Sequence, residues 1–416
     1  MPSVIFHIDM DSFFVSCERS KNESLKNKPV VIATNQKRAI ISAMSYEVKQ
    51  HGFKTGDPFY LVKEKIKNLI VVEPHYQLYS LMSKKIFNFI RDKFSQNLEI
   101  YSIDECYIDV TTKVKQFKSP IELAKIIQKS ILDIFKIPCS IGISYTKFLA
   151  KMSTNNAKPF GILETKKEDI INNFYKLPIK KIFGIGNSSA TKLKEINVLT
   201  YKDLVNCKND LFLKKVFGKN YYKLIEDLKG TNVSKQHILP KDIKSISNSK
   251  TFMDSDKDDV YYLIDELKKI ALNISKRAKD QNLVGKVVSL SLRLQNKIWI
   301  HKHKKIDGYT NEFDIIWKNI KFLFSQMWDD NKIRGLGIAI SDLKSTFNIQ
   351  KSLDLFKNSS SMNKVEKIIK ENNFYEGKEI LKTLKQFSKE KNINIENIKF
   401  LRKNTTIGTK KINLEE

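Results

Sequence analysis

The sequence predicts an α+β protein built from more than one domain. Short runs that alternate apolar and polar residues, as half-buried strands do, are interleaved with segments whose apolar residues recur at helical spacing. A stretch rich in Ser, Asn and Lys, residues 231–250, separates these elements from a second α/β segment at 251–345. The chain has 416 residues, which is enough for several domains of ~100–200 residues each.

The first 165 residues contain the elements of one layered unit. Gly52 ends a short helix as a C′ residue, and Pro159 with Gly161 follows another. Strands are predicted at 1–11, 28–33, 39–43, 68–73, 98–110 and 139–144, and helices at 12–22, 46–52, 76–94, 120–135 and 144–156. The β-α-β-β-α-β order resembles a ferredoxin-like layout with an insertion between the first strand and the first long helix.

The rest of the chain divides into three segments. Residues 166–247 hold 17 Lys, no Arg and eight acidic residues, a local net charge of +9. Residues 346–416 are rich in Lys and Asn and poorly patterned, so we expect partial disorder there. Between them, helices are predicted at 258–279 and 312–327, and strands at 287–294 and 333–343.

The charge of the chain points to a polyanionic partner. The net charge is +28, and nucleic acid is the first candidate for such a basic protein. A general preference for Lys is the simpler alternative, since only seven of the 74 basic residues are Arg, but it does not explain the excess over 46 acidic residues. No apolar run reaches the ~18 residues of a membrane span, and Asp9 and Asp11 interrupt the N-terminal apolar stretch. We therefore expect a cytoplasmic protein without a membrane partner.

Two pairs of acidic residues lie at predicted strands. Asp104 and Glu105 fall inside the alternating run 98–110, and burying two adjacent carboxylates unpaired in a strand is costly. A break in the strand at this point, as at a hairpin tip, could direct both carboxylates to one point. Asp9 and Asp11 end the first strand. Each pair alone is compatible with exposed turn residues. Together they favour a divalent metal site, and Mg²⁺ prefers one or two protein carboxylates with water and phosphate oxygens.

A Gly-Ile-Gly segment lies between two predicted helices at 177–193. This helix-hairpin-helix pattern lets backbone N–H groups approach a phosphate without reading bases. Flanking lysines favour that interpretation, and a plain pair of antiparallel helices is the alternative. The candidate DNA-binding residues are Lys180, Lys181, Gly184, Gly186 and Lys192.

In order and spacing, these motifs resemble the Y-family translesion DNA polymerases of the DinB/UmuC type over about residues 4–345. The metal motifs and the fingers segment of that family resemble Ile8-Asp9-Met10-Asp11-Ser12-Phe13-Phe14, Ser102-Ile103-Asp104-Glu105 and residues 42–49. The last strand and helix of its palm are similar to residues 142–147, 150–151 and 157–161, and its thumb hairpin to residues 182–186.

The resemblance implies a right-hand polymerase of low fidelity that adds deoxynucleotides to a primer 3′-OH and copies past damaged template bases. Its implied partners are primer-template DNA, deoxynucleoside triphosphates and a sliding clamp, and the implied state is a monomer. The implied domains are a ferredoxin-like palm (1–11 and 75–165), small fingers (12–74), a helical thumb (166–235), a linker (236–250), an α/β little finger (251–345) and a tail (346–416).

The resemblance also implies the roles of individual residues. Two Mg²⁺ ions would be held by Asp9, Asp104, Glu105 and the backbone carbonyl of Met10. The implied nucleotide-binding residues are Phe13, Phe14, Ser42, Tyr46, Lys49 and Lys158. Phe14 would exclude ribonucleotides by clashing with a 2′-OH, and the alternative for Lys158 is a cation at a helix C-terminus.

Two residues depart from the family pattern at the nucleotide site. Lys49 replaces the usual Arg, exchanging a bidentate fork for a point charge. Ala43 replaces a hydroxyl residue, so one phosphate hydrogen bond, worth roughly 0.5–1.5 kcal/mol, is absent or replaced. Whether triphosphate binding is weaker stays open, and neither departure removes a metal ligand.

The tail contains a short apolar cluster that resembles a sliding-clamp-binding peptide, with Ser352 where Gln is usual. A short helix packed on the little finger is the alternative. The residues that would bind the clamp are Leu353, Leu355 and Phe356.

Two other functions compete with polymerisation. A DNA-binding scaffold would not need the acidic set, and a nucleotidyl cyclase would not need a basic thumb.

Overall fold

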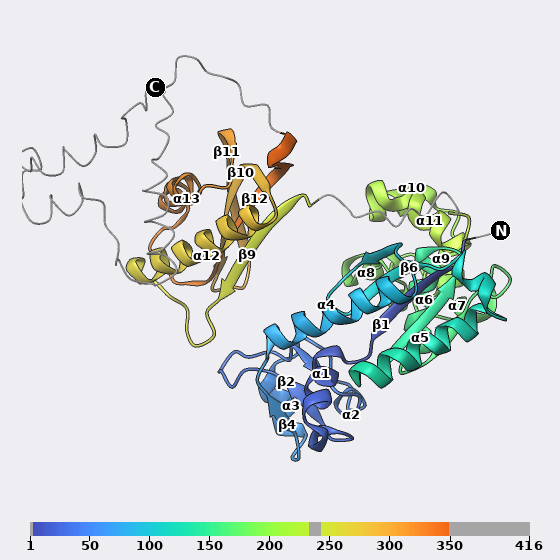
Figure 1. Ribbon diagram of the computed structural model, residues 1–416. Coiled ribbons are helices and arrows are strands. Elements are labelled where there is room, and N and C mark those ends of the chain that lie inside the picture. Colours follow the sequence, from blue (N-terminus) through green and yellow to red (C-terminus); the bar gives the residue numbers. More distant parts are fainter. Residues whose placement is uncertain (1–2, 233–242, 349–416) are drawn as a thin grey trace, which may run out of the picture. The chain divides into compact units, whose positions relative to one another are not determined.

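The computed structural model describes residues 3–232 and 243–348, and a five-stranded sheet lies at the centre of the first segment (Figure 1). Its strands, in spatial order, are β5 (Leu98–Ile100), β6 (Glu105–Asp109), β1 (Ile5–Met10), β7 (Cys139–Ser144) and β8 (Ile162–Glu164). The first four are antiparallel neighbours, which confirms the ferredoxin-like order. Strand β8 was not predicted, and it pairs in parallel with β7.

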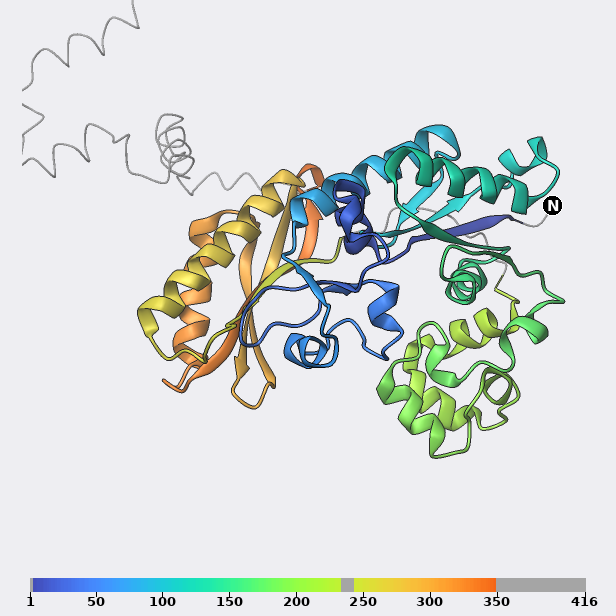
Figure 2. The same cartoon turned by 90° about the horizontal axis from the view of Figure 1, so that it is seen from below.

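Alternation along β1 separates the two faces of this sheet. Long helices cover one face of the sheet, and a further helix packs on the other face (Figure 2). These helices are α4 (Tyr76–Lys93) and α5 (Pro120–Phe135) on the first face and α6 (Lys147–Ala157) on the second. The residues of β1 in the α4–α5 core are Phe6, Ile8 and Met10. The period of two therefore directs His7 and Asp9 toward α6.

The predicted insertion between β1 and α4 contains a three-stranded sheet. Its strands are β3 (Ala43–Met44), β2 (Val30–Ile32) and β4 (Ile70–Val72), and its helices are α1 (Phe13–Lys21), α2 (Tyr46–Lys49) and α3 (Phe59–Lys65). The strand expected at 39–43 is mostly irregular, because Ile40 makes only an isolated bridge to Pro58. Helix α3 was missed, since seven residues after a Pro are too few for a clear period.

Residues 170–229 form a helical unit, and its apolar core also contains Phe148, Leu149 and Met152 of the helix at 147–157. Its helices are α7 (Ile170–Phe174), α8 (Asn187–Lys194), α9 (Tyr201–Val205), α10 (Asp210–Phe217) and α11 (Tyr221–Lys229). The first arm of the predicted hairpin is a single 3₁₀ turn, Ile179–Lys181, and not a helix. Pro178 precedes this turn, and Gly184 with a φ of +87° ends the segment.

Residues 245–345 form a four-stranded antiparallel sheet with two helices. Its strands, in spatial order, are β11 (Trp299–Thr310), β10 (Leu283–Leu294), β12 (Ile333–Ser345) and β9 (Ser245–Thr251), and its helices are α12 (Val260–Asp280) and α13 (Phe313–Met327). Assigning residues 245–250 to a linker was wrong. Only Ile246 of this edge strand is buried, so the strand has no alternation of apolar residues that the sequence could reveal. Its pairing with β12 defines it as a strand. On the opposite edge, β11 exposes all five side chains of the run His301–Lys305.

The clamp-peptide residues Leu353, Leu355 and Phe356 lie outside the described residues. Among the helices of residues 3–232 and 243–348, none is long and apolar enough to cross a membrane.

Candidate active site

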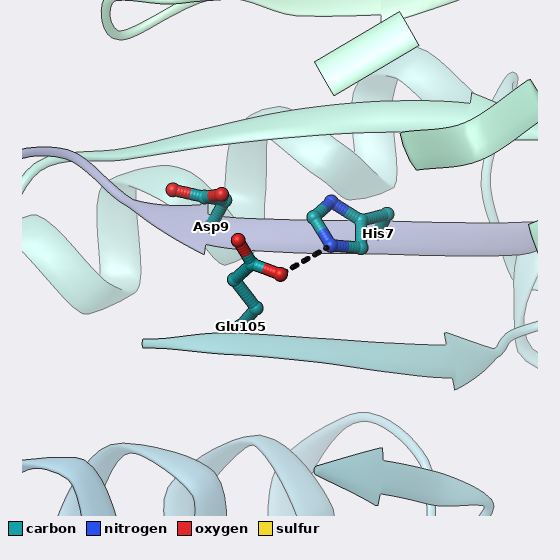
Figure 3. Close-up of side chains that lie close together, drawn as sticks. All are labelled: His7, Asp9 and Glu105. Atoms are coloured by element: carbon teal, nitrogen blue, oxygen red, sulfur yellow. Dashed lines mark ion pairs between the residues drawn. The ribbon is translucent and has the colours of Figure 1, made fainter. Parts of the chain in front are cut away.

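The register between β1 and β6 brings two acidic residues together. Asp9 lies directly opposite Glu105, so both side chains point to the same face of the sheet, toward α6. Asp9 is 2% exposed and Glu105 is half-buried. With His7, they place one ligand atom each within 4.8 Å of one another (Figure 3). The predicted hairpin is present, and its tip at residues 101–104 lies beside this group.

Two lysines neutralise these carboxylates. Lys151 on α6 bridges them, with its Nζ 3.2 Å from Asp9 Oδ2 and 2.7 Å from Glu105 Oε1. Lys158, just after α6, lies 2.5 Å from Asp9 Oδ1. Buried carboxylates need such positive charge, because an uncompensated charge in this position is costly. Hard carboxylate oxygens in this arrangement also fit a hard divalent cation such as Mg²⁺.

Burial and charge shift the protonation of all three residues. Burial raises the pKa of Asp9, although Lys158 and Lys151 oppose the shift. Burial also acts to raise the pKa of Glu105, but His7 and Lys151 outweigh it and hold that pKa well below its usual range. Burial lowers the pKa of His7 to about 4, so its imidazole is neutral at pH 7. The site therefore combines two carboxyl groups, Asp9 and Glu105, with a neutral imidazole, His7, that can take part in hydrogen bonds.

Asp104 takes part through its backbone. The N–H of Met10 donates to the Asp104 carbonyl oxygen at 2.9 Å, which ties the hairpin tip to β1. The Asp104 carboxylate accepts from the Ser102 hydroxyl at 2.5 Å and is not in the group formed with His7. The structure therefore pairs Asp9 with Glu105 and places Asp104 next to them, with its side chain turned to its own loop. The Met10 side chain lies in the core, so only its main chain can be a ligand.

The residues expected at the nucleotide differ in accessibility. Phe14 is half-buried, and its ring stacks on Tyr79 with 4.3 Å between centroids. Phe13 is 3% exposed and packs in the core, so its side chain is not available to a ligand. Lys49 is exposed, with its Nζ 3.0 Å from Ser12 Oγ. Ser42 is half-buried beside β3.

Asp11 is a buried connecting residue whose role the sequence did not reveal. Its carboxylate accepts hydrogen bonds from the Tyr46 hydroxyl at 3.0 Å, from Ser140 Oγ at 2.9 Å and from the Phe160 N–H at 2.8 Å. It therefore joins α2, β7 and the segment after Lys158. The spacing Asp-x-Asp was visible, but the three donors come from distant parts of the chain.

The residues of the Gly-Ile-Gly hairpin are accessible. Gly186 is the N-cap of α8, and a side chain built at Gly184 or Gly186 would meet no atom within 4 Å. The backbone is therefore open to a ligand at this point. The lysines expected to flank it are exposed: Lys180, Lys181 and Lys192.

Two family models match the chain. The impB/mucB/samB family matches residues 8–155, and the C-terminal domain of the impB/mucB/samB family matches residues 243–355.

Curated relatives align with about 85% of this chain. This chain is 36% identical to the DNA polymerase IV of Ureaplasma parvum serovar 3 over 356 residues. The aligned residues are 85% of this chain and 98% of the relative. This chain is 34% identical over 358 residues to the DNA polymerase IV of Oceanobacillus iheyensis, covering 85% of this chain and 84% of that relative. Relatives that are polymerases favour this function over a scaffold or a cyclase.

Solved structures are similar as well. A Y-family DNA polymerase chimera of Dbh and Dpo4 segments aligns over 82% of this chain and 99% of its own, with a TM-score of 0.72 and 25% identity. DinB from Sulfolobus solfataricus aligns over 81% of this chain and 98% of its own, with a TM-score of 0.56 and 24% identity. This similarity supports the fold alone. The chain therefore belongs to the Y family of translesion DNA polymerases, of the DNA polymerase IV type, and it is a DNA-directed DNA polymerase.

Proposed function

We propose that nucleotidyl transfer takes place on the α6 face of the five-stranded sheet. Asp9, Asp104 and Glu105 are the proposed side-chain ligands of two Mg²⁺ ions, and the main-chain carbonyl of Met10 is a further ligand. Asp104 would join them by turning its carboxylate away from the Ser102 hydroxyl. The observation that carries this proposal is the register of β1 and β6, which pairs Asp9 with Glu105 beneath two lysines. Bound Mg²⁺ would lower the pKa of the primer 3′-OH and neutralise charge on the triphosphate.

The two lysines have different proposed roles. The Lys151 side chain is 7% exposed and touches both carboxylates, so it stays with them and balances their charge. The Lys158 side chain is 30% exposed and touches only Asp9 of the two, so it can turn toward the phosphates of an incoming nucleotide. Phosphoryl transfer needs positioning and charge neutralisation more than covalent help, and these cations supply both.

Primer extension tests this proposal. In Asp9→Ala and Asp104→Ala we expect deoxynucleotide incorporation to fall by orders of magnitude, because a ligand of the metal is lost. Asp133→Ala is the matched control, since Asp133 is an exposed carboxylate of α5, the helix on the opposite face. Extension by Asp9→Ala at the rate of the control would refute the site.

The nucleotide is proposed to bind between the first sheet and α2. Tyr46, Lys49 and Lys158 would hold its phosphates, and Asp11 supports two of these positions by accepting from Tyr46 and from Phe160. Phe14 is the proposed sugar gate, and its stacking on Tyr79 fixes the plane of its ring. Phe14→Ala should therefore admit ribonucleotides, measured as the ratio of kcat/KM for ribo- and deoxynucleotides. An unchanged ratio would place the gate elsewhere.

The proposed domains follow the three sheets and the helical unit. The fingers contain the three-stranded sheet, the palm contains the five-stranded sheet, the thumb begins at residue 166, and the little finger begins at 245 because β9 belongs to its sheet. Contact of the thumb hairpin with the DNA backbone is supported by its open glycines and exposed lysines. Low fidelity, a monomeric state and a cytoplasmic location remain part of the proposal.

A sliding clamp is the proposed protein partner, through Leu353, Leu355 and Phe356. The support is the sequence pattern alone. A clamp pulldown compares the full chain with a variant that carries both Leu355→Ala and Phe356→Ala, and we expect capture to be lost. Equal capture of the two proteins would end this proposal.

A further inference from the structure

His7 is a fully buried imidazole next to the paired carboxylates. It lies on β1 between Tyr107 of β6 and Gly142 of β7, and it points to the same face as Asp9. The Tyr107 ring packs edge-on against it with 4.7 Å between centroids. A buried polar ring in this position needs a hydrogen-bonding explanation, because a buried polar group left without a partner destabilises the fold.

The two ring nitrogens of His7 face different groups. Nδ1 lies 2.9 Å from the hydroxyl oxygen of Thr154, on α6. Nε2 lies 3.6 Å from Glu105 Oε2, slightly beyond hydrogen-bond distance, and it has no other partner in the described part of the chain. In Figure 3 one Glu105 oxygen is directed to this nitrogen and the other toward Asp9.

Gly142 permits the contact between His7 and Thr154. It lies directly beside His7 in the sheet. A Cβ built on Gly142 would be 2.1 Å from the Ala150 carbonyl oxygen and 2.5 Å from Thr154 Oγ1. Because no side chain fits there, α6 can lie against the strand and bring the Thr154 hydroxyl to the ring.

The positions of the protons follow from these partners. The Glu105 carboxylate pairs with the Lys151 ammonium and accepts hydrogen bonds, so the nitrogen that faces it carries the hydrogen. Nδ1 is then an acceptor, and the single hydrogen of the Thr154 hydroxyl goes to it, in preference to the carbonyl oxygens of His7 and Ala150 at 3.0 Å. The Nε2–H tautomer therefore accepts a hydrogen bond from Thr154 at Nδ1 and directs its N–H toward Oε2, 3.6 Å away.

We propose that His7 is a positioning residue for Glu105: its Nε2–H, oriented by Thr154, attracts Oε2 so that Oε1 is directed to the metal side of the site. The proposal depends on the proposed role of Glu105 as a metal ligand. His7 would act as the partner of a ligand without binding substrate itself. Such outer partners typically change metal affinity or activity by about ten- to a hundred-fold when they are removed.

Three variants separate the hydrogen bond from packing. His7→Phe keeps a ring against Tyr107 and removes both nitrogens. His7→Gln keeps an N–H donor at about the position of Nε2. Thr154→Val keeps the volume of the threonine and removes its hydroxyl. Thermal unfolding of each variant checks that α6 still packs on the sheet.

The first measurement is Mn²⁺ binding to the full chain without nucleotide or DNA, followed by the electron paramagnetic resonance of free Mn²⁺. We expect affinity to fall roughly ten-fold or more in His7→Phe, less in Thr154→Val, and to be largely restored in His7→Gln. In primer extension, kcat should fall in the same order while KM for nucleotide is unchanged. Affinity in His7→Phe equal to wild type, or His7→Gln as weak as His7→Phe, would overturn the proposal. If His7→Phe fails to fold, Thr154→Val takes its place. Mn²⁺ affinity and kcat in Thr154→Val equal to those of the wild type would then overturn the proposal.

The second measurement identifies the tautomer. The ¹⁵N spectrum of labelled histidine should show His7 as the Nε2–H form, assigned by its absence in His7→Gln, and this form should lose its dominance in Thr154→Val. An Nδ1–H ring in the wild type would refute the assignment. Asp9→Asn separates this proposal from the broader one. If Asp9→Asn binds Mn²⁺ and extends primers as wild type does, the metal site itself is wrong. If only the His7 variants behave as wild type, the site stands without the positioning role.

Discussion

Strand β1 sends alternate residues to two faces of the sheet that are stabilised in different ways. On the α4–α5 face, Ile8 is fully buried among apolar side chains, and such burial favours folding by ~1.5–3 kcal/mol. On the α6 face, Asp9 is almost as buried, but its carboxylate depends on Lys151 and Lys158. The apolar face therefore holds the strand in place, whereas the acidic face opposes folding unless cations or protons compensate its charge.

The largest effect should come from Asp9→Asn. We expect primer extension to fall by orders of magnitude while the free energy of unfolding stays equal or rises, because the substitution removes a buried charge and keeps the side-chain volume. The measurements are single-turnover extension and denaturant unfolding without Mg²⁺. A large loss of stability would break the distinction between the two faces.

Lys151→Met should affect stability most. It leaves the buried Asp9 and the half-buried Glu105 without their shared cation, so the free energy of unfolding should fall by ~3–5 kcal/mol. Added Mg²⁺ should recover part of the loss. Urea unfolding with and without Mg²⁺ measures both effects, and Lys129→Met, an exposed lysine of α5, is the control. If the two variants are equally stable, the carboxylates do not need Lys151.

The pH dependence should show the cost of the Asp9 charge. Burial raises the pKa of Asp9 from 3.8 to about 6, so the folded state binds this proton more tightly than the unfolded chain. Its contribution to stability is present at low pH and is lost as the pH rises between these two values. Glu105 has the opposite sign, because its lowered pKa adds stability that is lost as the pH falls below about 4.5. The free energy of unfolding of the wild type, minus that of Asp9→Asn, should therefore decrease from about pH 4 to about pH 6. A difference that stays constant over this range would contradict the raised pKa of Asp9.

The smallest effect is expected on the apolar face. Ile8→Val should lower the free energy of unfolding by ~0.5–1.5 kcal/mol and leave the extension rate of the folded enzyme unchanged. Calorimetry and primer extension on one preparation measure both. A change in rate without a change in stability would show that the two faces are coupled.

Most of the fold could be predicted from the sequence, because its long elements have clear periods. Strand β7 and helix α5 begin and end at the predicted residues. Short or polar elements were less visible. Helix α3 has seven residues, and β9 presents a polar sequence with one buried residue, so both are defined by tertiary contacts and neither by periodicity.

The candidate site could be predicted in part. The motifs located Asp9 and Glu105, since each ends or begins a strand, and the antiparallel register then pairs them. The orientation of the Asp104 side chain depends on Ser102, which spacing does not reveal. His7 and Lys151 were not assigned a role, because a period of two shows that His7 shares a face with Asp9 but not that α6 lies against that face.

Strand β11 has a consequence for the behaviour of the protein in concentrated solution. Within residues 243–348, β11 is an edge strand of twelve residues, and its outer backbone groups could pair with the same edge of another molecule to form a continuous sheet. Its exposed run His301–Lys305 contains three lysines, and these charges would repel one another in such a pairing. The edge is thereby protected from self-association, and replacing Lys302, Lys304 and Lys305 by neutral polar residues should lower the concentration at which the protein aggregates.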